Sequence, residues 1–147
     1  MKIVDNPLYI DIEGKEYKVE EDYEKIYNDL KEGKTILHWE AGDSLFPLIK
    51  NMEYCMIKPL EHPNDVHIGD CVFCKLIDGN YMVHRVIEVV QIKGILYYRI
   101  GDTWGNTFGW STEIIGIATS TDIYQKEDES KGSPWYQEFE KLFFKNN

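Results

Sequence analysis

The stretch "CVFCKLIDGNYMVHRVIEVV", residues 71–90, predicts the class of fold. Two apolar runs rich in β-branched and aromatic residues flank Asp78-Gly79-Asn80. An Asp-Gly pair between two such runs is a strong signal for a tight β-hairpin. We therefore predict two antiparallel strands, one over residues 71–77 and one over residues 81–90.

Similar apolar runs separated by turn residues continue on both sides of this hairpin. The additional strands that we predict cover residues 8–12, 17–20, 35–40, 53–60, 94–102 and 114–125. Residues 20–32 instead show helical spacing, with Tyr23, Ile26, Tyr27 and Leu30 on one face. Gly33 fits the C-terminal cap of this helix. The expected fold is mostly β (α+β).

The composition divides the chain into four parts. Residues 1–35 are expected to form a strand-strand-helix extension and residues 36–125 a β domain. The charged residues 126–132 are expected to be a linker. Residues 133–147 predict a C-terminal amphipathic helix, because Ser133-Pro134 suits a helix start and apolar side chains share one face. We expect this helix to dock on its own domain; binding a partner is the alternative.

Length and charge exclude some classes of protein. The chain has 147 residues, enough for one domain, and a formal net charge of -10. An acidic chain repels phosphate backbones, so we expect no nucleic-acid partner. No apolar run approaches the roughly 18 residues that span a bilayer, and the N-terminus is too polar for a signal peptide. We expect a cytoplasmic protein without a membrane anchor; its oligomeric state is left open.

The cysteines and histidines do not suggest a metal centre or a cofactor. Cys71 and Cys74 form a CxxC pair inside a predicted strand, where residues three apart face opposite sides. The spacing of His62 and His67 fits no standard set of ligands. We therefore expect two small apolar core residues and surface histidines.

A serine lies between a predicted strand and an apolar run that contains a proline, in "WEAGDSLFPLI", residues 39–49. Gly42 permits a tight backbone just before Ser44, and a proline follows three residues later. Such a serine can begin a helical turn whose unpaired N–H groups hold an oxyanion. Alternatively, Ser44 is only a turn or helix-capping hydroxyl.

Two further residues supply the other parts of a nucleophilic site. His84 interrupts an apolar strand on the face of Met82 and Val86, where partial burial lowers an imidazole pKa as a general base requires. Asp102 ends the next predicted strand, where a carboxylate can orient that imidazole. The alternatives are a structural core histidine and an ordinary Asp turn.

Four motifs in this order resemble the superfamily of serine peptidases that includes signal peptidases and LexA-like self-cleaving repressors. The "GDSLFP" segment, residues 42–47, is similar to the family's G-x-S-M-x-P signature. The other three matching segments are "IGDCVFCK" (68–75), "VHRVIEV" (83–89), and "YYRIGD" (97–102) followed by Trp110 and "IIGIA". The family's base is usually lysine, but some signal peptidases use histidine, and His84 stands at that position. The resemblance implies a partly barrel-like peptidase core.

The resemblance also implies a mechanism without a cofactor. Ser44 is the expected nucleophile, His84 the general base and Asp102 the orienting acid. The substrate is expected to be an extended peptide or the protein itself. The residues expected to contact it are Gly42, Asp43, Leu45, Pro47 and Met82.

The chain also departs from this family. Leu45 replaces the usual methionine, the second acid after Asp102 is missing, and neither an anchor nor a DNA-binding helix-turn-helix precedes the core. Three readings therefore remain: a serine peptidase, an inactive domain of the same fold that binds a peptide or protein, and a structural protein in which Ser44 is a turn residue. Lys75 is the alternative candidate for the base.

Overall fold

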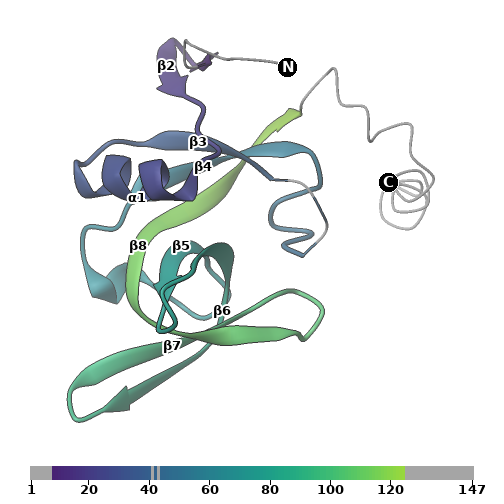
Figure 1. Cartoon of the computed structure of the whole chain (residues 1–147). Helices are drawn as coiled ribbons and strands as arrows, with labels where there is room; N and C mark the ends of the chain where they lie inside the picture. Colours follow the sequence, from purple (N-terminus) through teal and green to yellow (C-terminus); the bar gives the residue numbers. More distant parts are fainter. Residues whose placement is uncertain (1–7, 41, 43, 125–147) are drawn as a thin grey trace.

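The computed structural model describes residues 8–40, 42 and 44–124 (Figure 1). These residues form eight strands, one α-helix and one short 3₁₀ helix. In chain order they are β1 (Tyr9–Ile12), β2 (Lys15–Lys18), α1 (Tyr23–Lys31), β3 (Ile36–Glu40), β4 (Glu53–Pro59), η1 (Pro63–Asp65), β5 (Cys71–Leu76), β6 (Tyr81–Ile92), β7 (Ile95–Gly101) and β8 (Thr107–Tyr124).

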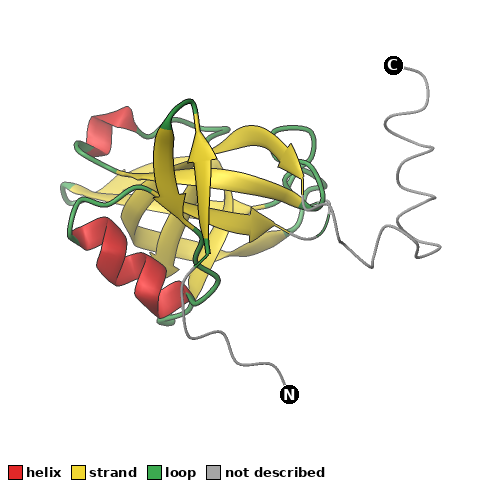
Figure 2. Ribbon diagram, turned by 90° about the horizontal axis from the view of Figure 1, so that it is seen from above, coloured by secondary structure: helices red, strands yellow, loops and turns green. Residues whose placement is uncertain are grey.

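Six of the strands form one antiparallel sheet that closes on itself. Its order is β3-β4-β8-β5-β6-β7, and β8 pairs a second time with β7. Strands β5, β6, β7 and β8 therefore make a small closed barrel, to which β3 and β4 are added along β8 (Figures 1 and 2). The ladders of β8 with all three of its partners contain register shifts, and such bulges let a strand bend around a barrel.

Two clusters of buried side chains fill the molecule. The inner cluster takes residues from all four barrel strands, including Val72, Val86 and Ile100, so it is the barrel interior. The outer cluster joins one outer face of the barrel to α1, β3, β4 and the loop after β3. Cys71 belongs to the outer cluster and Cys74 to the inner one, so the CxxC cysteines face opposite sides, as the strand spacing predicts.

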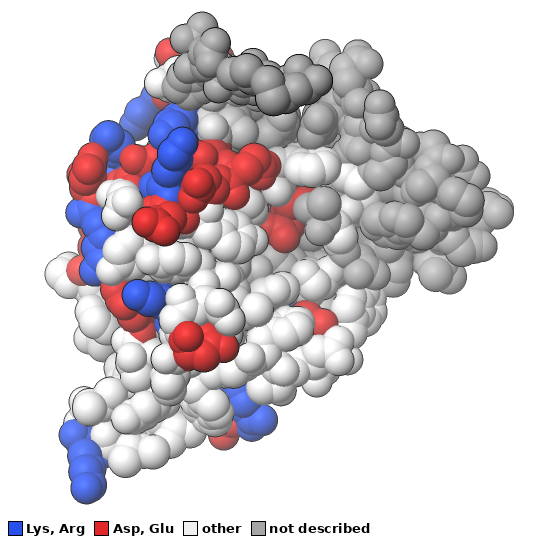
Figure 3. Space-filling view, in the orientation of Figure 1, with Lys and Arg blue, Asp and Glu red and all other residues white. Residues whose placement is uncertain are grey.

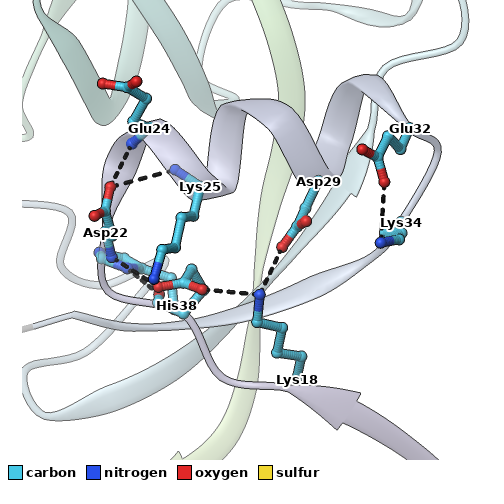
Figure 4. Close-up of polar contacts among 9 residues, drawn as sticks. Lys18, Asp22, Glu24, Lys25, Asp29, Glu32, Lys34 and His38 are labelled. Atoms are coloured by element: carbon cyan, nitrogen blue, oxygen red, sulfur yellow. Dashed lines mark hydrogen bonds and ion pairs between the residues drawn. The ribbon is translucent and has the colours of Figure 1, made fainter. Parts of the chain in front are cut away.

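Helix α1 packs its apolar face onto this outer cluster. Its buried residues are Ile26 and Leu30, at 0% and 3% exposure. Asp22 caps the helix, because its carboxylate accepts from the backbone N–H groups of Glu24 and Lys25 (Figure 4). The helix therefore begins at Tyr23 and not at residue 20, since the capping residue itself stays extended.

The other predicted elements are found with small shifts, with one larger difference. Strand β8 begins at Thr107, seven residues before the predicted start at residue 114. A tight turn follows Asp102, so the chain reverses direction at once and β8 begins early. The predicted linker 126–132 and C-terminal helix 133–147 lie outside the described residues.

Charged side chains are unevenly distributed over the surface. In the view of Figure 3, basic and acidic residues mix over α1 and β2, while the lower face is mostly uncharged. Within the described part of the chain, no helix has the length and apolarity needed to cross a membrane.

Candidate active site

Ser44 lies in the loop between β3 and β4, which is closed at its base. The backbone N–H of Met52 donates to the Glu40 carbonyl at 2.8 Å. Inside the loop, the Leu45 carbonyl accepts from the N–H groups of Leu48 and Ile49, at 2.9 and 3.1 Å. Ser44 thus stands at the start of a single helical turn.

Buried residues anchor this turn. Leu45 and Ile49 are each 1% exposed and belong to the outer core cluster. Leu45 is one of the residues predicted to contact a substrate, and its side chain is buried in this core cluster. Any contact made by Leu45 would come from its backbone.

The other predicted substrate residues have mixed positions. Gly42 adopts φ +113°, a conformation that favours glycine. Pro47 is exposed, and Met82 is half-buried against the inner cluster. Asp43 lies outside the described residues.

Asp102 organises the turn between β7 and β8. Its Oδ1 accepts from the N–H groups of Trp104 and Asn106, both at 2.9 Å, and its Oδ2 accepts from Asn106 Nδ2 at 2.7 Å. Burial raises the pKa of this carboxyl, but these hydrogen bonds and nearby His84 outweigh burial and hold the pKa below its usual value. Asp102 is therefore a carboxylate at neutral pH.

One hydrogen bond joins the Asp102 turn to the serine turn. The backbone N–H of Thr103, the residue after Asp102, donates to the Ser44 carbonyl at 2.9 Å. Residues 59 positions apart in sequence are thereby held in direct contact. The backbones of Ser44 and Asp102 are separated by a single peptide unit and this bond.

His84 lies beside the same turn. It faces Val72 across the β5–β6 ladder, and its neighbour Arg85 pairs with Gly101, the last residue of β7. The imidazole packs on the Phe108 ring, with centroids 4.5 Å apart. Burial lowers the pKa of His84, and the charge of Asp102 opposes that effect. The ring is therefore neutral at pH 7, the state that can accept a proton.

The candidate catalytic side chains are not hydrogen-bonded to one another in the described part of the chain. Among the described residues no hydrogen bond joins Ser44 to His84, and His84 Nδ1 is buried without a hydrogen-bond partner. Both oxygens of Asp102 are used within its own turn. The structure thus brings the Ser44 backbone beside the Asp102 turn and Asp102 close enough to affect the His84 charge, and catalytic hydrogen bonds are often long in proteins without substrate.

Lys75, the alternative base, has other neighbours. Its Nζ lies over the rings of Tyr27 and Tyr81, 5.9 and 5.6 Å from their centroids. This places the ammonium on the side of α1, in an aromatic setting. The geometry gives it no link to the serine turn.

Two residues near Ser44 are absent from the sequence-based prediction. Thr103 contacts Ser44 through its backbone, and Asn51 Oδ1 accepts from the Gly42 N–H. No motif marks either residue, because a backbone contact and a single amide inside a loop leave no periodic or spaced pattern.

Histidines and acids elsewhere do not gather into a metal-binding group. Within residues 8–40, 42 and 44–124, no three side chains of His, Cys, Asp or Glu are arranged to hold an ion. His67 is exposed and lies 3.7 Å from Asp70.

Known proteins offer no further guide to this site. No protein-family model matches the chain, and no curated protein or solved structure matches it either.

Proposed function

We propose that the protein is a serine peptidase in which Ser44 is the nucleophile and His84 the general base. The observation that carries this proposal is the hydrogen bond from Thr103 to the Ser44 carbonyl, which holds the serine turn against the end of β7. His84 and Asp102 belong to the same end of the barrel. The order of the four motifs, similar to that of signal peptidases and LexA-like proteins, supports the same reaction.

Each residue has a role that follows from its surroundings. Neutral His84 takes the proton of the Ser44 hydroxyl as oxygen attacks a peptide carbonyl, and returns it to the leaving amine. Asp102 remains ionised and stabilises the imidazolium electrostatically. The backbone N–H of Ser44, at the start of its turn, is a donor for the oxyanion.

A peptide library tests this proposal. The wild type is incubated with a mixture of short peptides, and new termini are identified by mass spectrometry. We expect a limited set of cleavages that Ser44→Ala and His84→Gln abolish. Thr119→Ala and His67→Gln are the controls, because they remove an exposed hydroxyl and an exposed imidazole elsewhere. Cleavage that persists in Ser44→Ala would refute the role of the serine.

The pH profile of cleavage gives a second test. Because burial lowers the pKa of His84, the active neutral form persists below pH 6.5, the ordinary value for histidine. We expect kcat/KM, which reports the free protein, to fall on the acid side with a midpoint below pH 6.5. A midpoint above pH 7 would contradict His84 as the base.

A second candidate function is peptide binding without cleavage. It is favoured by one observation: both Asp102 oxygens are engaged inside their own turn, so none is left solely for His84. A binding domain would leave every library peptide intact, and Ser44→Ala would retain peptides as well as the wild type does. Fluorescence anisotropy with labelled library peptides distinguishes this outcome from a peptidase.

A further inference from the structure

Several buried side-chain atoms in the strand before the serine turn and in residues that contact its loop make no hydrogen bond to another described residue. A buried donor or acceptor left unpaired destabilises a fold, so each one calls for an explanation. In the described part of the chain, five side-chain atoms are buried and lack a hydrogen bond. They are Trp39 Nε1, Glu40 Oε2, Asn51 Nδ2, His84 Nδ1 and Thr103 Oγ1.

All five belong to segments that border the candidate site. Trp39 and Glu40 lead into the serine loop, and Asn51 and Thr103 bond to residues within it. Functional sites are where proteins most often retain unsatisfied polar groups. The concentration therefore favours a function at this end of the barrel over a purely structural loop.

Asn51 is the most constrained of these residues. It is 2% exposed, and its Oδ1 accepts from the Gly42 N–H. An amide group is planar, so the fixed Oδ1 also fixes the direction of the Nδ2 donors. Only the Oδ1 atom of Asn51 is needed to hold the serine loop at Gly42. The nitrogen remains as a buried donor without an acceptor in the described structure.

The Asn51 amide is hydrogen-bonded to the backbone two residues before the nucleophile. Gly42 and Ser44 are two residues apart, so at most about 7 Å separates their Cα atoms. The turn that carries Ser44 is itself held by Thr103 and by the buried Leu45 and Ile49. Gly42 is thus held by Asn51, and Ser44 is held by Thr103 and by its own turn.

We propose that Asn51 Nδ2 is the side-chain donor of the oxyanion hole. This inference rests on the proposed peptidase function. When Ser44 Oγ bonds to the peptide carbon, the π electrons of the carbonyl move to its oxygen and the hydroxyl proton moves to His84. Asn51 Nδ2 donates to that oxyanion beside the Ser44 N–H. Collapse breaks the C–N bond, His84 protonates the amine, and water then releases the acyl group.

The cost of the unpaired donor is the physical reason for this role. A donor that has no acceptor in the free protein gains its hydrogen bond when negative charge develops. Such an interaction is stronger in the transition state than in the ground state, so it raises kcat and leaves KM nearly unchanged.

Two substitutions separate the donor from the acceptor. Asn51→Asp keeps an oxygen for the Gly42 N–H and removes the Nδ2 donor, whereas Asn51→Leu removes both. Asn64→Asp, at an exposed position in η1, makes the same change in charge away from the site. Kinetics use a peptide that the wild type cleaves in the library, at pH 8, with thermal melting to compare folding.

The donor role predicts a specific pattern. We expect kcat to fall about 10²- to 10³-fold in both Asn51 variants, with KM within about threefold of the wild type, and no change in Asn64→Asp. If Asn51→Asp retains kcat while Asn51→Leu loses it, Asn51 only positions the loop and the inference is overturned. If the wild type cleaves nothing, the proposed function itself fails and the inference fails with it.

A measurement on the wild type covers the case in which the variants do not fold. A peptide aldehyde of the cleaved sequence forms a tetrahedral adduct with the Ser44 hydroxyl. We expect the side-chain amide protons of Asn51 to shift downfield in ¹H–¹⁵N spectra when the adduct forms, because Nδ2 gains a hydrogen bond to the oxyanion. Unshifted Asn51 resonances in a protein that carries the adduct would overturn the inference.

Discussion

Glu53 shows how a single buried carboxylate can hold two segments together. It is 0% exposed, and it accepts from the Lys50 N–H at 2.8 Å, from the Asp122 N–H at 2.6 Å and from the Ser120 hydroxyl. One side chain therefore fixes both the exit of the serine loop and the end of β8. Hydrogen bonds to charged groups are among the stronger ones in proteins.

Removal of this carboxylate should lower the stability of the folded protein. We expect Glu53→Ala to lower the free energy of unfolding by about 3 kcal/mol or more, because three donors lose their acceptor inside the protein. Glu53→Gln, which keeps one oxygen, should cost less. Urea denaturation measures both, with exposed Glu61→Ala as the control. Equal losses in Glu53→Ala and Glu61→Ala would contradict the structural role.

Glu40 is a second buried acid, with a different consequence. Its carboxylate lies 3.5 Å from Nε2 of His38, whose own ring packs against Tyr23. Burial, with a smaller contribution from the charge of Glu21, raises the pKa of Glu40 to about 8. In the unfolded chain the carboxyl titrates near its ordinary value. Between these two pKa values the folded state holds a proton that the unfolded state has released.

Because of this difference in proton binding, the free energy of unfolding falls as pH rises. The contribution of protonated Glu40 to the free energy of unfolding is fully present below about pH 4.5 and is lost as pH rises through about 8. We expect Glu40→Gln to become more stable relative to the wild type by about 5 kcal/mol over that range, at about 1.4 kcal/mol for each pKa unit of the shift. Urea denaturation at several pH values measures the difference. A difference independent of pH would show that Glu40 ionises normally.

His38 acts in the opposite direction. Burial lowers its pKa, although a hydrogen bond with the Glu20 carbonyl partly opposes this. The unfolded state then binds more protons below pH 6.5, so this histidine destabilises the fold as pH falls from there. Comparison of Glu40→Gln with the wild type isolates the carboxyl, because both proteins keep His38.

At the scale of elements, α1 and β8 meet at a glycine. A Cβ atom at Gly116 would lie 2.8 Å from the Lys58 carbonyl oxygen, 2.9 Å from Ile57 Cγ2 and 3.1 Å from Leu30 Cδ1. Both the neighbouring strand and the helix therefore approach the backbone of β8 directly. Such contact leaves no space for a methyl group without movement of β4 or α1.

A substitution at this contact should be destabilising. We expect Gly116→Ala to reduce the free energy of unfolding by about 2 kcal/mol, within the usual range for overpacking. Thr119→Ala, an exposed position on the same strand, is the control for strand propensity. Thermal or urea denaturation gives the comparison. A Gly116→Ala variant as stable as the wild type would mean that α1 packs less closely.

The elements differ in how far the sequence predicts them. The β5–β6 hairpin follows from the Asp-Gly turn, and α1 from the spacing of four apolar residues. The early start of β8 is missed because Gly105 and Gly109 interrupt the alternation. The barrel-like core is expected from the family resemblance, but the role of β8 in closing it is not, since β8 pairs with β4, β5 and β7 and no local pattern specifies three partners.

The candidate site, too, is only partly predictable from the sequence. Ser44, His84 and Asp102 can be proposed from residue types and order alone. Their shared location depends on the Thr103 hydrogen bond and on the Arg85–Gly101 pairing, which only the folded chain reveals. Asn51 could not be proposed from the sequence, because its role depends on one amide oxygen and one unpaired nitrogen.

At the scale of the whole molecule, the two core clusters bury all three cysteines. Cys55, Cys71 and Cys74 are 0%, 3% and 0% exposed. Burial raises the pKa of both Cys71 and Cys74 to about 12. The thiolate, which is the reactive form, is therefore scarce at neutral pH and shielded from reagents on both sides of β5.

Thiol labelling tests this burial. We expect Ellman's reagent to modify the native protein at least about 10³-fold more slowly than the unfolded chain, because reaction requires opening of the core. In denaturant all three thiols should react at once. Rapid modification of one thiol in the native protein would indicate that its cluster opens locally, and mass spectrometry of tryptic peptides would identify which.

The position of β8 at the end of the described chain has a consequence for synthesis. The ribosome delivers β4 and β5 well before the strand that separates them. At about 5 to 20 residues per second, roughly 3 to 13 s pass between the completion of β4 at Pro59 and that of β8 at Tyr124. During that interval both strands present unpaired backbone edges, which are templates for aggregation. A nascent chain of this protein is thus exposed to aggregation at these edges until β8 emerges from the ribosome.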